Sequence, residues 1–120
     1  SNCAFVLRED YGILNFCRVI LPNTNNNSWA KLESDYNNVV YSYTKKYGVP
    51  KISKSEFEET QYSDYSKLHS VMTGNCRYYS IFFIEGGTIT VSIESNKTVW
   101  ITYEDYIAID KIEKIQQDEL

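Results

Sequence analysis

One amphipathic segment, residues 28–47, constrains the fold of this chain more than any other feature. Apolar and aromatic side chains recur there at three- and four-residue spacing, at Trp29, Leu32, Tyr36, Val39 or Val40, Tyr43 and Tyr47. This spacing places them on one stripe of an α-helix, and charged and amide side chains take most of the other positions. The pattern therefore predicts one long helix that buries a single face.

Both ends of this predicted helix carry recognisable signals. Asn27 or Ser28 can cap its first turn, because a side-chain oxygen at that position accepts a hydrogen bond from a free backbone N–H. At the other end the sequence reads TKKYGVPKIS, in which Gly48 can turn the chain and Pro50 prevents the helix from continuing. We interpret this stretch as a helix terminator and not as a ligand loop.

The remaining β-forming segments predict antiparallel strands. They are Ala4–Arg8, residues 13–21, the run RYYSIFFI at 77–84, TITVSIES at 88–95 and TVWITYED at 98–105. Turn chemistry separates them, at Asp10-Tyr11-Gly12, at Gly86-Gly87 and at Asn96-Lys97. Two segments stay open at this level: residues 52–65 fit a strand or an irregular turn, and residues 65–72 fit a short helix or a loop.

Alternation in the last two strands identifies a buried face. The side chains predicted to point inward are Ile89, Val91, Ile93, Val99, Ile101 and Tyr103. An antiparallel sheet with one buried face needs a cover, and the helix over 28–47 has the stripe to provide it. We expect a single α+β domain over residues 1–120, with a four- to five-stranded antiparallel sheet in β-β-α-β-β-β order and the long helix on one face.

Aromatic residues are also expected on the opposite face of this sheet. Tyr78, Phe82 and Trp100 fall there if their strands alternate as assigned, and they form a candidate interaction face. A short C-terminal helix, with Tyr106, Ile109, Ile112 and Ile115 at three-residue steps, is expected to cover part of the same face.

The sequence offers little for catalysis or metal binding. Net charge is −4, with no stripe of Lys and Arg that would follow phosphates, so nucleic acid is not an expected partner. No apolar run approaches the roughly 20 residues that span a bilayer. The spacing of Cys3, Cys17 and Cys76 fits no zinc pattern, and a Cys17–Cys76 disulfide and two buried thiols stay open as alternatives. We expect no catalytic residue, metal or cofactor.

Several short motifs together resemble a known group of proteins. The motifs are KYGxP at the helix end, GxCxY, GGxIxVxI and VxIxYxD, carried by Trp29, Leu32, Tyr36, Lys46, Tyr47, Gly48, Pro50, Phe57, Gly74, Cys76, Tyr78, Gly87, Ile89, Tyr103 and Asp105. This set is similar to small secreted or envelope-associated proteins of Bacteroides-type gut bacteria, and the order of elements is similar to that of β-lactamase-inhibitor-protein and SmpA-like domains. The resemblance implies a periplasmic, outer-membrane-associated or secreted protein, shortened relative to relatives that carry a further N-terminal half-domain.

Three classes of function follow from these patterns. The first is a non-enzymatic domain that binds a protein or envelope component through Tyr78, Phe82 and Trp100. The second is a self-assembling, dimerising domain that pairs through the open edge of the first hairpin. The third is a small enzyme, which needs a pocket that gathers polar groups around His69, Tyr62 and Glu56.

Overall fold

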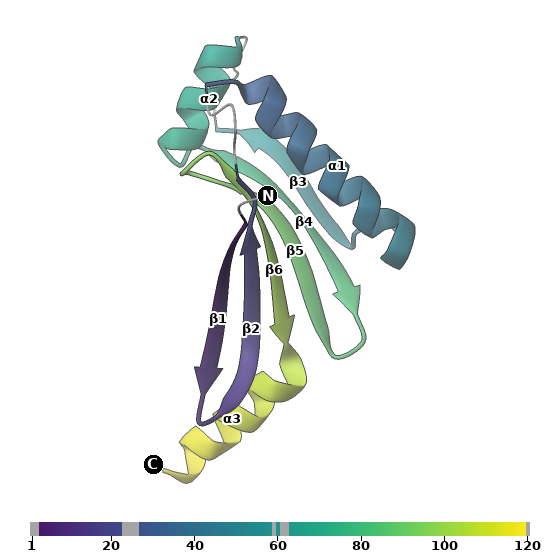
Figure 1. Cartoon of the computed structure of the whole chain (residues 1–120), viewed down its shortest axis with the longest axis vertical. Helices are drawn as coiled ribbons and strands as arrows, with labels where there is room; N and C mark the ends of the chain where they lie inside the picture. Colours follow the sequence, from purple (N-terminus) through teal and green to yellow (C-terminus); the bar gives the residue numbers. More distant parts are fainter. Residues whose placement is uncertain (1–2, 23–26, 59, 61–62, 120) are drawn as a thin grey trace.

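The computed structural model describes residues 3–22, 27–58, 60 and 63–119. These residues form an α+β fold with six strands and three helices, shown in Figure 1. In chain order the elements are β1 (Ala4–Asp10), β2 (Ile13–Ile20), α1 (Trp29–Tyr47), β3 (Ile52–Phe57), α2 (Asp64–Met72), β4 (Cys76–Ile84), β5 (Gly87–Glu94), β6 (Thr98–Asp105) and α3 (Tyr106–Asp118).

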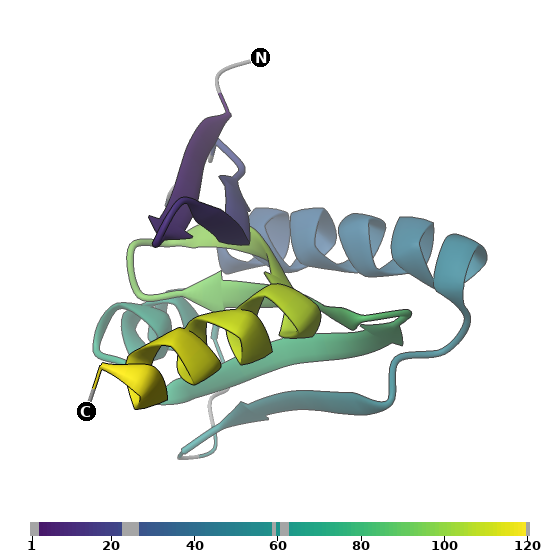
Figure 2. The ribbon, with the colours of Figure 1, turned by 90° about the horizontal axis from the view of Figure 1, so that it is seen from below.

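The strands form one open antiparallel sheet in the order β1-β2-β6-β5-β4-β3. The β4–β5–β6 meander is its centre, β2 pairs with β6, and β3 pairs with β4. The strands β1 and β3 are therefore the two edges of the sheet. Figure 2 shows the β1–β2 hairpin turned steeply out of the plane of β4 and β5, as the twist of a sheet accumulates across its strands.

The predicted long helix is confirmed, and it packs on one face of β4, β5 and β6. Ser28 caps it by accepting from the N–H of Lys31, and Gly48 ends it with a positive φ of 86° while its N–H donates to the carbonyl of Thr44. The buried core is formed by residues of α1, α2 and the sheet: Trp29, Leu32, Tyr36, Leu68, Val71, Phe82, Ile89, Val91, Ile93 and Val99. The inward alternation predicted for β5 and β6 is thus the observed one.

Helix α2 settles the open assignment of residues 65–72 as a helix. Ser63 and Ser66 form a reciprocal capping box at its start. Asp64, in the first turn of α2, also accepts from the backbone N–H groups of Trp29 and Ala30, at 3.0 and 2.8 Å. The carboxylate thereby satisfies two of the free donors at the start of α1 and ties the two helices together.

The expected C-terminal helix is present as α3, which has 13 residues and contacts β2 and β5. Asp105 caps it by accepting from the N–H of Ala108. Its buried residues are Ala108 and Ile112, whereas Tyr106, expected on the apolar stripe, is exposed. The helix lies beside the tip of the β1–β2 hairpin (Figure 1) and lines a cleft together with Phe16 and Glu104.

The expected count of four to five strands was too low. The extra strand is β3, within the segment that the sequence left open between a strand and a turn. Its sequence ISKSEF has polar or charged side chains at four successive positions between Ile52 and Phe57, and all but the last residue are exposed. The sequence therefore lacks the hydrophobic alternation that would mark a strand. The pairing of β3 with β4 therefore depends on backbone hydrogen bonds more than on side-chain burial.

Candidate interaction surface

The outer strand β1 presents apolar side chains to solvent on both faces of the sheet. Phe5 is 68% exposed, Leu7 is 64% exposed and Val6 is 41% exposed. Phe5 and Leu7 lie opposite Val19 and Cys17 of β2, on the face that α1 covers further along the sheet, and Val6 points to the other face. We call these three residues the apolar edge. Among the strands of the described residues, β1 pairs with β2 alone, so its outer N–H and C=O groups are available to another strand.

The opposite edge, β3, is built differently. Its sequence ISKSEF places Lys54 and Glu56 on the exposed edge, with Lys54 Nζ 3.8 Å from Glu56 Oε1, and Pro50 and Lys51 precede it. Charged side chains and proline are the usual protection of an edge strand against pairing. The first four residues of β1, Ala4 to Leu7, carry no such protection. The two edges therefore differ in where their charged residues lie: within β3 itself, and only at Arg8, Glu9 and Asp10 in β1.

A β-bulge shapes the end of the hairpin next to the apolar edge. The register shifts between Arg8 and Glu9, which leaves Asn15 of β2 as the extra residue. Asn15 is buried, and its Nδ2 donates to the carbonyls of Arg8 and Ile13 and to Asp10 Oδ2 at 3.1 to 3.3 Å. The only sequence signal for this position is a polar residue inside the apolar run ILNFCRVI.

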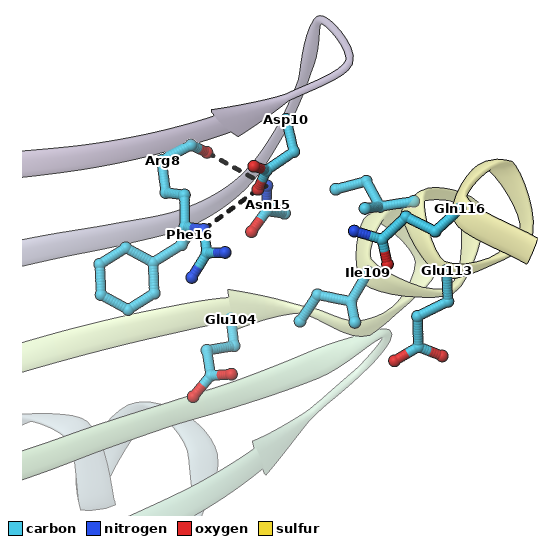
Figure 3. Close-up of a pocket in the computed structure, with 9 residues that line it drawn as sticks. Arg8, Asp10, Asn15, Phe16, Glu104, Ile109, Glu113 and Gln116 are labelled. Carbon is cyan, nitrogen blue, oxygen red and sulfur yellow. Dashed lines mark hydrogen bonds and ion pairs between the residues drawn. The ribbon is translucent and has the colours of Figure 1, made fainter. Parts of the chain in front are cut away.

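A surface cleft of about 240 Å³ lies between this bulge and α3 (Figure 3). Figure 3 shows Asn15 beside Arg8 and Asp10, with the Gln116 amide reaching toward them from α3. The Nε of Arg8 donates to Asp10 Oδ2 at 3.0 Å, so the Asp10 carboxylate holds both Arg8 and Asn15. These polar groups stabilise the bulge, and we assign the cleft a structural part in orienting the hairpin.

The three residues of the predicted interaction face do not lie together. Trp100 lies on the face away from α1, as expected, because its neighbour Ile101 opposes the buried Val91. Tyr78 and Phe82 lie on the opposite face from the predicted one: Phe82 pairs with Ile89 and is only 1% exposed under α1, and Tyr78 packs edge-on against Trp29. A buried Phe82 offers no surface to a partner.

Trp100 has a local partner of its own. The Cζ of Arg18 lies 4.2 Å from the Trp100 ring centroid and 4.7 Å from that of Phe16. Such cation–π contacts stabilise a guanidinium next to an aromatic face. Arg18 Nε also donates to Thr102 Oγ1 at 3.1 Å, and Trp100 Nε1 donates to Thr98 Oγ1 at 2.9 Å. This stack ties β2 to β6, and β2 is the strand that supports the apolar edge.

Tyr78 provides a prediction about pH. Burial, followed by the negative charge and the hydrogen bond of Glu33, raises the pKa of Tyr78 to about 12 from the usual 10.0. The unfolded chain therefore loses this proton at lower pH than the folded chain, so the stability that Tyr78 contributes is complete below pH 10 and falls between pH 10 and about 12. Urea titrations across this range should show a smaller loss of stability for Tyr78→Phe than for the wild type. Equal losses in both proteins would contradict this assignment.

The residues of the enzyme hypothesis are only partly placed. His69 is exposed on α2, and Glu56 on β3 lines a separate cleft with Glu58 and Arg77 that His69 does not line. Tyr62 lies outside the described residues. The cleft that Glu56 lines therefore does not include His69.

Cysteines and metal-binding groups add no further site among the described residues. Cys3, Cys17 and Cys76 are free thiols, so the Cys17–Cys76 disulfide is not formed, and burial raises the pKa of the Cys76 thiol to about 11. Across residues 3–22, 27–58, 60 and 63–119, no group of three or more His, Cys, Asp and Glu side chains is arranged so that it could hold a metal ion. In the same part of the chain no helix has the length and apolar character to cross a membrane.

Comparisons with known proteins gave no match to a family model, a curated protein or a solved structure. The structure itself shows an α+β fold with an open six-stranded antiparallel sheet.

Proposed function

We propose that this chain is a non-enzymatic binding domain that takes up an extended segment of a protein partner along β1. The observation that carries the proposal is the apolar edge, a row of exposed apolar side chains on a strand whose outer side pairs with no strand in the described part of the chain. The function keeps the binding role expected from the sequence and moves the interface from Tyr78, Phe82 and Trp100 to β1.

Strand addition matches the chemistry of this edge. An added strand gains affinity from main-chain hydrogen bonds and specificity from the side chains that alternate across the sheet. Phe5 and Leu7 would pack beside side chains of the incoming segment on one face of the sheet, and Val6 would do so on the other face. The preferred partner segment is therefore extended, uncharged over about four residues and apolar on both faces.

A peptide-binding experiment tests this function. Extended peptides with apolar residues on both faces are titrated into the isotope-labelled chain, and amide shifts are followed by NMR. We expect the largest shifts in residues 4–10, because the backbone groups of β1 gain partners. Leu7→Lys should weaken binding more than about tenfold, which corresponds to roughly 1.4 kcal/mol.

A matched variant on the other edge provides the control. Ile52 begins β3 and is exposed, so Ile52→Lys makes the same kind of change on the protected edge and should leave peptide binding unaltered. Shifts confined to the α3 cleft or to β3, or no binding by any extended peptide, would refute strand addition at β1.

A further inference from the structure

We propose that the segment taken up by β1 is β1 of a second copy of this chain, paired antiparallel with Val6 opposite Val6. This inference rests on the proposed function and names its partner. The result is a symmetric dimer in which the two sheets join into one across a two-fold axis.

Charge along β1 determines the direction of pairing. Residues Ala4 to Leu7 are uncharged, and Arg8, Glu9 and Asp10 follow at the other end. A parallel copy would place like charges side by side at all three of these positions, and like charges directly opposite one another destabilise a sheet. An antiparallel copy places the apolar half of each strand against the apolar half of the other.

The faces of the sheet then limit the register. In a continuous sheet, residues that lie opposite each other point to the same face. When a strand pairs antiparallel with its own copy, this condition holds only if one residue lies on the two-fold axis, opposite the same residue of the other copy. With Val6 on the axis, Phe5 of each copy opposes Leu7 of the other, and Ala4 opposes Arg8. All of these residues lie within β1.

Neighbouring registers are poorer. With Leu7 on the axis, Glu9 would oppose Phe5, which removes apolar contact and places a carboxylate against an aromatic ring. With Phe5 on the axis, Leu7 would oppose Cys3, which precedes the start of β1 at Ala4. The Val6 register alone pairs the whole apolar edge with itself inside the strand.

The expected dimer is weak. A single pair of edge strands buries less than the roughly 1,200 Å² of a standard interface. We therefore expect a dissociation constant on the order of 1 μM to 1 mM and a mass that depends on concentration.

A charge-exchange experiment tests both the partner and the register. Solution mass is measured by light scattering and sedimentation over a dilution series, with a reductant present so that thiols cannot link chains. The wild type should pass from one chain to two as concentration rises. Val6→Lys and Val6→Glu alone should each raise the dissociation constant more than about tenfold, because each opposes a like charge across the axis. An equimolar mixture of the two should dimerise again, since the introduced lysine then faces the introduced glutamate.

The same exchanges at Val49 provide the control. Val49 is an exposed valine outside the strands, so Val49→Lys and Val49→Glu should both dimerise like the wild type. A wild type that remains monomeric throughout the series, a Val6→Lys protein that dimerises normally, or a mixture that stays monomeric would overturn the inference. If the wild type stays monomeric while an unrelated extended peptide shifts the β1 amides, the inference falls and the proposed function stands. If neither occurs, both fall.

Discussion

Trp29→Ala should destabilise the fold by about 3–5 kcal/mol, the range for removing a large buried aromatic side chain. Trp29 is 3% exposed at the start of α1, and its ring packs edge-on against Phe57 of β3 and Tyr78 of β4, with centroids 5.1 and 4.9 Å away. Its backbone N–H also donates to Asp64 of α2. One side chain therefore joins two strands at the point where the two helices meet.

Urea denaturation with a matched aromatic control measures this effect. Tyr41 lies on the same helix and is exposed, so Tyr41→Ala should change stability by no more than about 0.5 kcal/mol. A Trp29→Ala protein as stable as Tyr41→Ala would mean that α1 is not anchored to the sheet as described.

Gly87→Ala should cost about 3 kcal/mol, at the upper end for forcing extra volume into a packed site. Gly87 begins β5 opposite Asp105, and a Cβ added there would meet the carbonyl oxygen of Glu104 at 2.1 Å. Because that obstacle is backbone, β5 and β6 would have to separate at the start of α3. The glycine is needed for close approach, and the positive φ of this hairpin belongs to Gly86.

Gly74 provides a control that distinguishes the steric clash at Gly87 from the backbone strain of a left-handed conformation. Gly74 has a φ of 78° and open space around its Cα, so Gly74→Ala should cost only the roughly 1–2 kcal/mol of a left-handed conformation. The two variants are compared by the free energy of unfolding. A loss for Gly87→Ala no greater than that for Gly74→Ala would contradict the close approach of β5 to β6.

Periodicity was enough to predict α1 and the buried faces of β5 and β6. The stripe of α1 and the alternation of Ile89, Val91 and Ile93 each have one dominant apolar face, so each pattern determines which face is buried. The strand RYYSIFFI has apolar side chains on both faces, and its alternation does not decide which face is buried.

Ser80 shows why the buried face of β4 is hard to predict from the sequence. This serine lies between Tyr78 and Phe82 on the same face of β4 and suggests a polar face. In the structure Ser80 is buried, and its hydroxyl shares a 2.8 Å hydrogen bond with that of Tyr36 on α1. A core position can hold a polar side chain when a neighbouring helix satisfies it, and a single sequence does not show that neighbour.

The apolar edge could be predicted only in part. The sequence predicted a strand over Ala4–Arg8 and an open edge on the first hairpin. It could not show that β2 pairs with β6, the pairing that leaves β1 at the edge of the sheet. It also could not show the register shift at Asn15, whose side chain contacts Arg8 and Asp10 at the charged end of β1. Both depend on pairings between residues far apart in the chain.

Amide hydrogen exchange of the wild-type chain tests the role of β1 most directly, because both edges of the sheet are read in one experiment. Exchange is followed at low and high protein concentration, and at low concentration with an extended apolar peptide. We predict that amides of residues 4–10 gain protection at high concentration and with peptide, while those of residues 52–57 on β3 do not. Unchanged exchange of β1 under both conditions, or equal protection of the two edges, would contradict the assignment of β1 as the binding edge.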